Sequence, residues 1–383
     1  MSNLRFLRFD DPRTYLETTK GYDDSFMNFG IGSLWDFLSG ISSRQLPDIP
    51  TYVFAIYRGE DLLWVSYNYL VFFFEFTDRP ILPQIRSTTR ITLSINKQDF
   101  AWMMSTPCPA DEQLGTDPEL LAAATTLLAT SVLATLPTPR NFDKIIGPLK
   151  PVEAFLHTWV ALLAAQGISA KILLGTFGAS RVSYATRASL PPPSAVPPPY
   201  RVERAARADL PAVAVLYQHF ELTSPWRGII SIEDAVRNLT GPADAGLVWL
   251  VRLEEAAPDG PPAAFAVLGR ATPRTIAVRN VYVAPDHRRK GVAETMVRAI
   301  TRYFLGAAPY GVHGVPDGPP QWGFKQEVNL NVGDPSAEGV YRRSGFLFPV
   351  GTGEDMTGGV DPETGRRSWY TSVWRGVELN PEA

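Results

Sequence analysis

Residues 281–293 read V-Y-V-A-P-D-H-R-R-K-G-V-A, and this stretch decides the fold of the second half of the chain. A short apolar strand is expected to end at Pro285, and residues 294–304 then repeat apolar side chains at helical spacing. A strand that enters a helix through a glycine-containing turn points several unpaired backbone N–H groups at one spot, where the helix dipole favours negative charge. Three cations lie in the same turn: Arg288, Arg289 and Lys290. The stretch therefore predicts a binding site for a pyrophosphate group.

The form of the turn indicates which pyrophosphate ligand to expect. It reads neither G-x-G-x-x-G nor G-x-x-x-x-G-K-[ST], which disfavours a dinucleotide or ATP. Its pattern R-x-x-G-x-A, at Arg288, Gly291 and Ala293, resembles the acyl-CoA loop of the GNAT superfamily of acetyltransferases.

A second motif, D-P-S-A-E-G-V-Y-R-R-S-G-F, follows at residues 334–346. Residues 328–332 before it alternate apolar side chains with asparagine, which is typical of a strand. The GNAT pattern at this place is a strand, then N-x-x-A-x-x-x-Y on a short helix, and a G-F that starts the next strand. The matching positions are Asp334 in the asparagine place, Ala337, Tyr341, Gly345 and Phe346. Two motifs in the family's order strengthen each other.

The resemblance covers residues 200–375 and implies a GNAT fold, an α/β (α+β) class with a central, mostly antiparallel mixed sheet flanked by helices. Residues 201–220 resemble the family's first strand and first helix, with an apolar stripe along the helix. The next strands are expected at residues 247–253, 263–268 and 275–283, the last of which leads into the phosphate loop.

A proline-rich run at residues 191–199, P-P-P-S-A-V-P-P-P, predicts a linker between this GNAT domain and an N-terminal half, residues 1–190. Two domains are also expected because 383 residues are too many for one GNAT unit. In the N-terminal half we expect a hairpin at residues 52–57 and 62–67 and a helix at residues 118–136. A strand at residues 144–146, a helix at residues 152–165 and two strands at residues 171–174 and 181–185 should follow.

This order also resembles GNAT, so the N-terminal half is interpreted as a degenerate GNAT-like α/β domain. No acyl-CoA loop follows its candidate strand, because Gly147 precedes Pro148 and proline lacks the N–H that a phosphate cradle needs. We expect this half to cover the catalytic half or to shape the acceptor site. Residues 70–97 fit none of these elements.

Composition narrows the class of protein. Apolar residues make up 45% of the chain, enough for packed cores, and a net charge of −3 gives no basic field for nucleic acid. A single cysteine, Cys108, excludes an intramolecular disulfide framework. The N-terminus shows no apolar signal core, and the aromatic run at residues 69–74 is too short to span a bilayer. The expectation is a soluble, cytoplasmic protein that binds no membrane and no metal, with its oligomeric state left open.

The resemblance implies roles for the loop and its neighbours. Backbone N–H groups of residues 289–293 would hold the pyrophosphate, and the pantetheine arm would pair with the strand end at residues 281–283. The candidate residues for binding acetyl-CoA are Val281, Tyr282, Val283, Arg288, Arg289, Lys290, Gly291, Val292, Ala293 and Asp334. Asp334 lacks the amide donor of the family's asparagine, and a helix cap with Pro335 at the first helical position explains it equally well.

Tyr341 is the candidate catalytic residue, because it takes the place of the family's tyrosine that protonates the leaving sulfur. A structural role in packing the short helix is the alternative. The general base stays open: some GNAT enzymes carry a glutamate on the fourth strand, but residues 275–283 contain no carboxylate. Glu327, His313, an ordered water and bulk solvent are the substitutes considered.

The leading interpretation is an acyl-CoA-dependent N-acyltransferase that passes acetyl from acetyl-CoA to a small-molecule or peptide amine by direct attack. Cys108 has no recognisable partner set, which argues against a covalent thiol intermediate. The main alternative is an inactive, CoA-binding GNAT-like module that acts through a partner. A nucleotide-binding protein of another class would need a magnesium ligand set that the loop lacks.

Overall fold

The computed structural model describes residues 3–39, 41, 52–68, 102–193, 199–224, 228–257, 260–314, 318–351 and 356–379. The expectations for residues 70–97 and for the middle of the proline-rich linker, residues 194–198, fall outside the described residues.

The helices and strands alternate in two series along the chain. The first series is β1 (Leu4–Phe9), α1 (Pro12–Thr19), α2 (Asn28–Leu38), β2 (Tyr52–Arg58), β3 (Asp61–Asn68), β4 (Trp102–Ser105), α3 (Cys108–Thr116), α4 (Pro118–Thr135), β5 (Lys144–Pro148), α5 (Leu149–Ala165) and β6 (Ala170–Ala185). The second is β7 (Tyr200–Arg204), α6 (Leu210–Thr223), α7 (Ile232–Asp244), β8 (Val248–Leu253), β9 (Ala264–Gly269), β10 (Thr275–Val283), α8 (Val292–Phe304), β11 (Glu327–Val332), α9 (Pro335–Arg343) and β12 (Trp369–Leu379).

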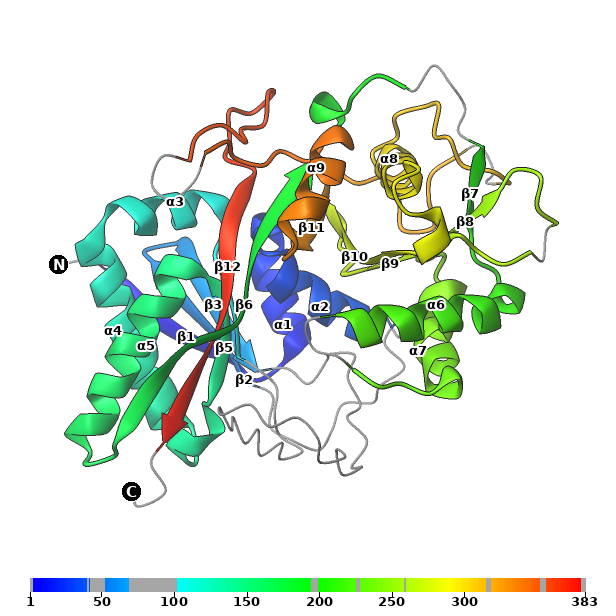
Figure 1. Ribbon diagram of the computed structural model, residues 1–383. Helices are drawn as coiled ribbons and strands as arrows, with labels where there is room; N and C mark the ends of the chain where they lie inside the picture. Colours follow the sequence, from blue (N-terminus) through cyan, green and yellow to red (C-terminus); the bar gives the residue numbers. More distant parts are fainter. Residues whose placement is uncertain are drawn as a thin grey trace.

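One mixed sheet runs through the whole molecule (Figure 1), in the order β1-β2-β3-β4-β5-β12-β6-β11-β10-β9-β8-β7. The order is symmetric about its centre: in each half, three antiparallel pairings lead to one parallel pair, β4 with β5 and β10 with β11. Each half therefore has the strand order expected of a GNAT unit, which confirms the prediction of a mixed α/β sheet with a degenerate N-terminal copy.

The two halves exchange their last strands. The strand β6 from the first half pairs with β11, while β12 from the second half pairs with β5, and β6 and β12 pair with each other at the centre. These ladders join the halves by backbone hydrogen bonds, so neither half has a complete sheet without the other.

Three sequence-based assignments are wrong. Residues 171–174 and 181–185 belong to the single long strand β6. The G-F at Gly345 and Phe346 starts no strand, because the main chain there bonds to Ser189 and Tyr184 outside any ladder, and the next strand is β12. The sequence pattern predicts that the strand at residues 144–146 is the counterpart of β10, the strand that leads into the Gly291 turn. It is instead β5, which corresponds to β11, and the counterpart of β10 is the four-residue strand β4.

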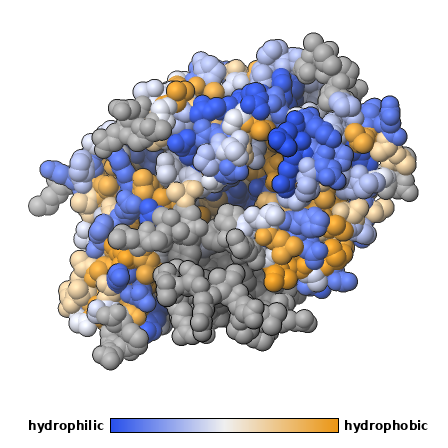
Figure 2. Space-filling view, in the orientation of Figure 1, coloured by the Kyte–Doolittle hydropathy of each residue, from blue (hydrophilic) through white to orange (hydrophobic). Residues whose placement is uncertain are grey.

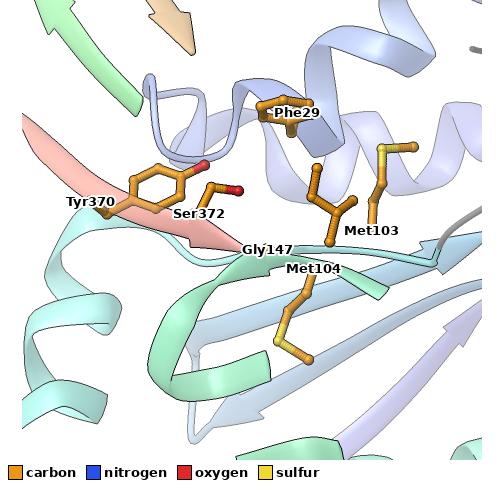
Figure 3. Close-up of a pocket in the computed structure, with 7 residues that line it drawn as sticks. Phe29, Met103, Met104, Gly147, Tyr370 and Ser372 are labelled. Atoms are coloured by element: carbon orange, nitrogen blue, oxygen red, sulfur yellow. The ribbon is translucent and has the colours of Figure 1, made fainter. Parts of the chain in front are cut away.

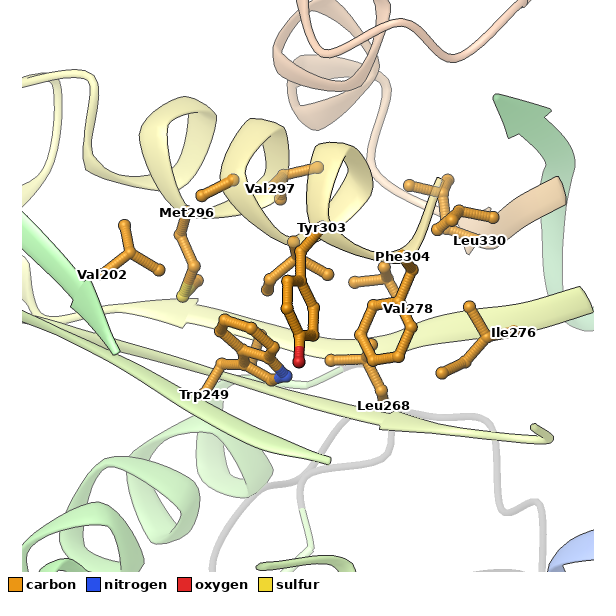
Figure 4. Close-up of a cluster of buried hydrophobic side chains, with 14 of the residues drawn as sticks. Val202, Trp249, Leu268, Ile276, Val278, Met296, Val297, Tyr303, Phe304 and Leu330 are labelled. Carbon is orange, nitrogen blue, oxygen red and sulfur yellow. The ribbon is translucent and has the colours of Figure 1, made fainter. Parts of the chain in front are cut away.

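The second half buries one apolar face of its sheet under α8 (Figure 4). Met296, Val297 and Ile300 of α8 are fully buried against Val278 of β10 and Leu330 of β11. The opposite face of this sheet is covered by α6 and α7, whose core residues contact Phe265 and Tyr282. The strands of the second half therefore lie between two layers of helices, with α8 on one side and α6 on the other.

A helix of the N-terminal half closes part of the α6 side. Asn28 and Asp36 of α2 hold the turn between β9 and β10, where Asn28 donates to the Arg270 carbonyl at 2.8 Å and Asp36 accepts from the Arg270 N–H at 2.6 Å. A Cβ on Gly32 would meet the Arg270 Cβ at 2.5 Å, so only glycine lets α2 approach so closely.

Within the described residues, one helix, α4, is long and apolar enough to cross a membrane. Its residues Leu120, Leu128 and Val132 are buried in the core that α4 forms with α5 and the sheet of the first half. This packing accounts for its apolar composition as that of a core helix.

Candidate active site

The N-terminus of α8 presents free backbone donors to solvent. Gly291 caps the helix in the left-handed region, with φ at 79°, and Arg289 also has a positive φ of 59°. The first helical bond closes from Thr295 N–H to the Gly291 carbonyl at 2.9 Å. No side chain caps α8, and within the described part of the chain nothing accepts from the N–H groups of Val292, Ala293 and Glu294.

The space over this helix end is clear. A Cβ on Gly291 would meet no heavy atom within 4 Å. Arg289 and Lys290 are exposed, and neither forms a hydrogen bond or an ion pair with another described residue. In Figure 2, hydrophilic residues cover α8 and α9, while hydrophobic residues gather over α6 and α7. The donors, the glycine and two free cations thus fit a pyrophosphate at the predicted place.

One acidic side chain lies in the same turn and is neutralised. Glu294 accepts from Arg343 of α9 at 2.6 Å and pairs with Arg298 at 3.4 Å. The third predicted cation, Arg288, folds back over the Tyr282 ring and donates to the Val283 carbonyl at 3.0 Å. Arg288 is therefore held at the strand end, although it is exposed like Arg289 and Lys290.

Beyond the helix start, the strands β10 and β11 part. Their parallel pairing runs only from Thr275 with Glu327 to Val278 with Leu330. The Ala284 N–H donates to β9, at the Ala263 carbonyl, so alternation along β10 turns the N–H and C=O groups of Val281 and Val283 away from β9. Apart from the Val283 carbonyl, which accepts from Arg288, these groups form a strand edge of the kind that an extended pantetheine arm can pair with.

Tyr341 lies on α9, partly buried against the same core as Val281 and Val283. Its ring packs edge-on against Phe346, with the centroids 6.0 Å apart. Burial and the charge of Asp334 raise the pKa of Tyr341 to about 12. The phenol therefore stays protonated at physiological pH and is a hydrogen-bond donor on the α8 side of the sheet.

Asp334 caps α9. It accepts from the Ser336 N–H at 2.8 Å, Ser336 Oγ donates to its other oxygen at 2.8 Å, and Pro335 occupies the first helical position. This geometry confirms the capping interpretation of the aspartate.

Neither side chain considered as general base lies in a position to act. Glu327 is the first residue of β11, at the paired end of the strands, where it accepts from Arg366 at 2.6 Å and from the Ser25 N–H at 2.7 Å. His313 is exposed, and its backbone N–H donates to the Val202 carbonyl on the outermost strand β7. Glu327 is thus a buried structural anion, and His313 lies several strands from the parting of β10 and β11.

Polar side chains that the sequence analysis did not select gather on the α6 face of the split. A bulge in β10 between Val278 and Asn280 places Arg279 and Asn280 on this face, where Arg279 lies 3.9 Å from Asp36 of α2. On β11, Asn329 and Asn331 face the same way, because Val328, Leu330 and Val332 pack under α8. Among the described residues, Asn329 Nδ2 and Asn331 Oδ1 are buried without a hydrogen-bond partner.

The equivalent place in the N-terminal half is closed. The helix α3 follows β4 directly, its cap is Pro107, and the Cys108 N–H donates to the Asp24 carboxylate at 3.1 Å. The strands do not part, since a Cβ on Gly147 would meet the Met104 carbonyl oxygen at 2.6 Å. Figure 3 shows Phe29, Tyr370 and Ser372 around the small cavity that remains beside them. The loop that corresponds to the Gly291 turn in this half is thus 106–108, and not the one after Gly147 that the sequence-based expectation used.

Comparison with known proteins places the second half in a family. Residues 216–313 match the model of the acetyltransferase (GNAT) family. A search of curated proteins gave no match.

Solved structures resemble the fold at low identity. A tandem GNAT protein from the clavulanic acid biosynthesis pathway is 12% identical, with 98% of each chain covered and a TM-score of 0.44. A GCN5-related N-acetyltransferase from Sphaerobacter thermophilus is 11% identical, with 98% of this chain and 95% of that chain covered and a TM-score of 0.44. The spermidine N-acetyltransferase of Vibrio cholerae, solved with CoA and spermine, is 18% identical over 47% of this chain and 95% of its own, with a TM-score of 0.29. The matched residues, 216–313, include the strand β10, the Gly291 turn and the helix α8, so this part of the C-terminal half is similar to a GNAT-family acetyltransferase domain.

Proposed function

We propose that this chain is an acyl-CoA-dependent N-acyltransferase that transfers acetyl from acetyl-CoA to a primary amine of a small molecule or peptide by direct attack. One observation carries the proposal: the uncapped start of α8 presents the N–H groups of Val292, Ala293 and Glu294 beside the free edge of β10. A helix N-terminus of this kind favours a bound pyrophosphate through its donors and its dipole.

The residues around the split supply the remaining requirements. Acetyl-CoA supplies an activated acyl carbonyl and a thiol leaving group. The free N–H groups at Val281 and Val283 are suited to hold the pantetheine arm and to polarise the carbonyl. Arg289 and Lys290 are suited to the phosphate charges.

Tyr341 is suited to stabilise the departing sulfur by a hydrogen bond. Its pKa of about 12 exceeds that of an ordinary thiol, about 8.5, so complete proton transfer to a free thiolate would be uphill by about 5 kcal/mol. The proposal therefore gives Tyr341 the role of hydrogen-bond donor while the C–S bond breaks, with solvent completing the protonation of the thiol.

The proposal is tested by calorimetry with acetyl-CoA on the wild type and on Gly291→Glu. The substitution puts a carboxylate where the pyrophosphate is proposed to bind, so we expect no measurable binding. Gly167→Glu is a matched control, since Gly167 also has a φ of 78° and open space around its Cβ but ends α5. Equal acetyl-CoA affinity in Gly291→Glu and Gly167→Glu would refute the cradle.

A thiol-release assay with polyamines, amino acids, aminoglycosides and peptide N-termini then separates an enzyme from a binding module. We expect release with at least one class of amine. Acetyl-CoA binding without release from any of them would support the inactive, CoA-binding alternative.

A further inference from the structure

The helix α6, which covers the face of the sheet opposite α8, carries a buried carboxylate that has no role in the transfer described above. Glu221, near the end of α6, is 2% exposed. Its Oε2 has no hydrogen-bond partner among the described residues, and no described Lys or Arg forms an ion pair with it. Buried carboxylates are ordinarily paired, because isolated burial of the charge is costly. An unpaired one needs another explanation.

Glu221 is connected to the strand that bears the split. One turn earlier on α6, Tyr217 packs its ring against Phe265 of β9, with the centroids 5.9 Å apart. The Tyr217 hydroxyl lies near enough to Glu221 to lower the pKa of its carboxyl, and it also interacts electrostatically with Arg279, the residue at the bulge of β10. Arg279 in turn lies 3.9 Å from Asp36 of α2. The titratable group beside Glu221 is thus Tyr217 on its own helix, while Arg279 on β10 and Asp36 on α2 lie beyond Tyr217. The preceding residue of α6, Phe220, packs its ring against Tyr282 of β10, with the centroids 6.4 Å apart, so this end of α6 lies on β10.

The face of β10 and β11 that α6 covers is the polar one. The α8 face of β10 and β11 is filled by side chains such as Val278, Met296 and Ile300, which are all buried. The α6 face instead carries Asn280, Asn329 and Asn331, two of them with unpartnered polar atoms. An acyl group held between the parted strands can therefore be attacked by a polar nucleophile from the α6 face.

We infer that Glu221 is the general base of the transfer, an assignment that rests on the proposed function. As the nitrogen of the acceptor forms its bond to the acyl carbon, the Glu221 carboxylate takes the proton that the nitrogen loses. The C–S bond breaks, its electron pair stays on sulfur, and the thiolate, stabilised by a hydrogen bond from Tyr341, is protonated by solvent. The amide and free CoA leave, and Glu221 passes its proton to solvent.

Burial brings the pKa of Glu221 close to the pH at which the transfer is expected to run. Burial raises the pKa of Glu221 to about 7, and the Tyr217 hydroxyl lowers it in part. A base with a pKa near the working pH is both ionised and basic enough to accept a proton, which is the condition that general-base catalysis favours.

The test is the pH profile of kcat/KM for thiol release, measured with an accepted amine on the wild type and on Glu221→Gln. In the wild type we expect kcat/KM to rise with pH around an apparent pKa near 7, and we call this rise the acidic limb of the profile. In Glu221→Gln the acidic limb should be absent, and kcat/KM at pH 8 should be about a hundredfold lower than in the wild type. Acetyl-CoA affinity should stay within twofold. Glu233→Gln, which removes an exposed carboxylate of α7, should leave the profile unchanged.

A second variant keeps the carboxylate and alters only its partner. Tyr217→Phe removes the hydroxyl that lowers the pKa of Glu221, so the acidic limb should move to higher pH while the maximal rate persists. A purely structural role for Glu221 would not shift a kinetic limb.

The outcomes separate the two proposals. Wild-type turnover with the same limb and rate in Glu221→Gln would overturn the assignment of Glu221 alone. Absence of thiol release from the wild type with every amine would overturn the transfer function and the base with it, whereas loss of acetyl-CoA binding in Glu221→Gln would show that the residue supports the fold of the site instead of proton transfer.

Discussion

The free energy of unfolding of Glu221→Gln, compared with that of the wild type, should increase as the pH rises. The pKa of Glu221 rises from its ordinary 4.5 to about 7 because the side chain is buried. Since one pKa unit corresponds to about 1.4 kcal/mol, the ionised carboxylate opposes folding by about 3 kcal/mol above pH 7. Glutamine has nearly the same shape and never ionises, so it avoids this penalty.

The sign follows from proton binding. Between pH 4.5 and about 7 the folded state holds the Glu221 proton more tightly than the unfolded state, so the free energy of unfolding falls as pH rises through this window. The stability advantage of Glu221→Gln over the wild type should therefore grow by about 2 kcal/mol between pH 5.5 and pH 8.5.

Urea unfolding of both proteins at these two pH values measures the difference. A buried glutamine N–H₂ without an acceptor costs about 1–3 kcal/mol, but this cost is the same at both pH values and cancels in the comparison. Glu233→Gln controls for the loss of one exposed carboxylate on the neighbouring helix. A difference between wild type and Glu221→Gln that stays flat from pH 5.5 to 8.5 would refute the reasoning, and Glu221 would then titrate in the folded protein as it does in the unfolded chain.

Three further predictions follow from the site and its supports. Tyr341→Phe should lower kcat at least tenfold while the acetyl-CoA dissociation constant changes less than threefold, because the lost hydrogen bond forms to the leaving sulfur; an unchanged kcat would remove Tyr341 from the mechanism. Glu327→Gln should lower the free energy of unfolding by about 3 kcal/mol in urea titrations, since it leaves Arg366 buried without its anion, and wild-type stability in this variant would contradict the structural role of the pair. Calorimetry should give one acetyl-CoA per chain, because Asp24 already occupies the helix start in the N-terminal half, and a stoichiometry of two would disprove that closure.

The phosphate loop and its helix could be predicted from sequence because every determinant is local. A strand end, a glycine that accepts a φ of 79° and an amphipathic helix all lie within residues 281–304. The cap of α9 at Asp334 was likewise readable from Asp-Pro-Ser alone. These short-range patterns predicted the turn and both helix starts correctly.

The sheet beyond the loop could not be predicted because its register depends on contacts between distant residues. The strand β12 pairs with β5, whose residues lie more than two hundred positions earlier in the chain, and no local pattern encodes that choice. The strand β4 has only four residues, all buried, so it offers no alternation to detect. This is why β5 was mistaken for the strand that precedes a phosphate loop.

Glu221 escaped detection for a related reason. In the sequence it ends an apolar stripe on α6, where a carboxylate reads as the polar boundary of a helix. Only the fold shows that it is buried, that Tyr217 links it to Arg279 of β10 and that no described cation pairs with it. The burial that gives the group its chemistry is a tertiary property.

The two halves share one strand order, yet their two equivalent helix starts, those of α8 and α3, differ in whether a described carboxylate already accepts from them. In the second half, Gly291 leaves the N–H groups of α8 exposed beside parted strands. In the first half, the Asp24 carboxylate takes the equivalent N–H of Cys108, while Phe26 and Met27 also donate to Asp24. Asp24 thus provides from within the chain the negative charge that a pyrophosphate would bring. The first half is thereby free to serve as a rigid wall, and α2, which follows Asp24 directly, carries the Asp36 that contacts Arg279 on the acceptor face.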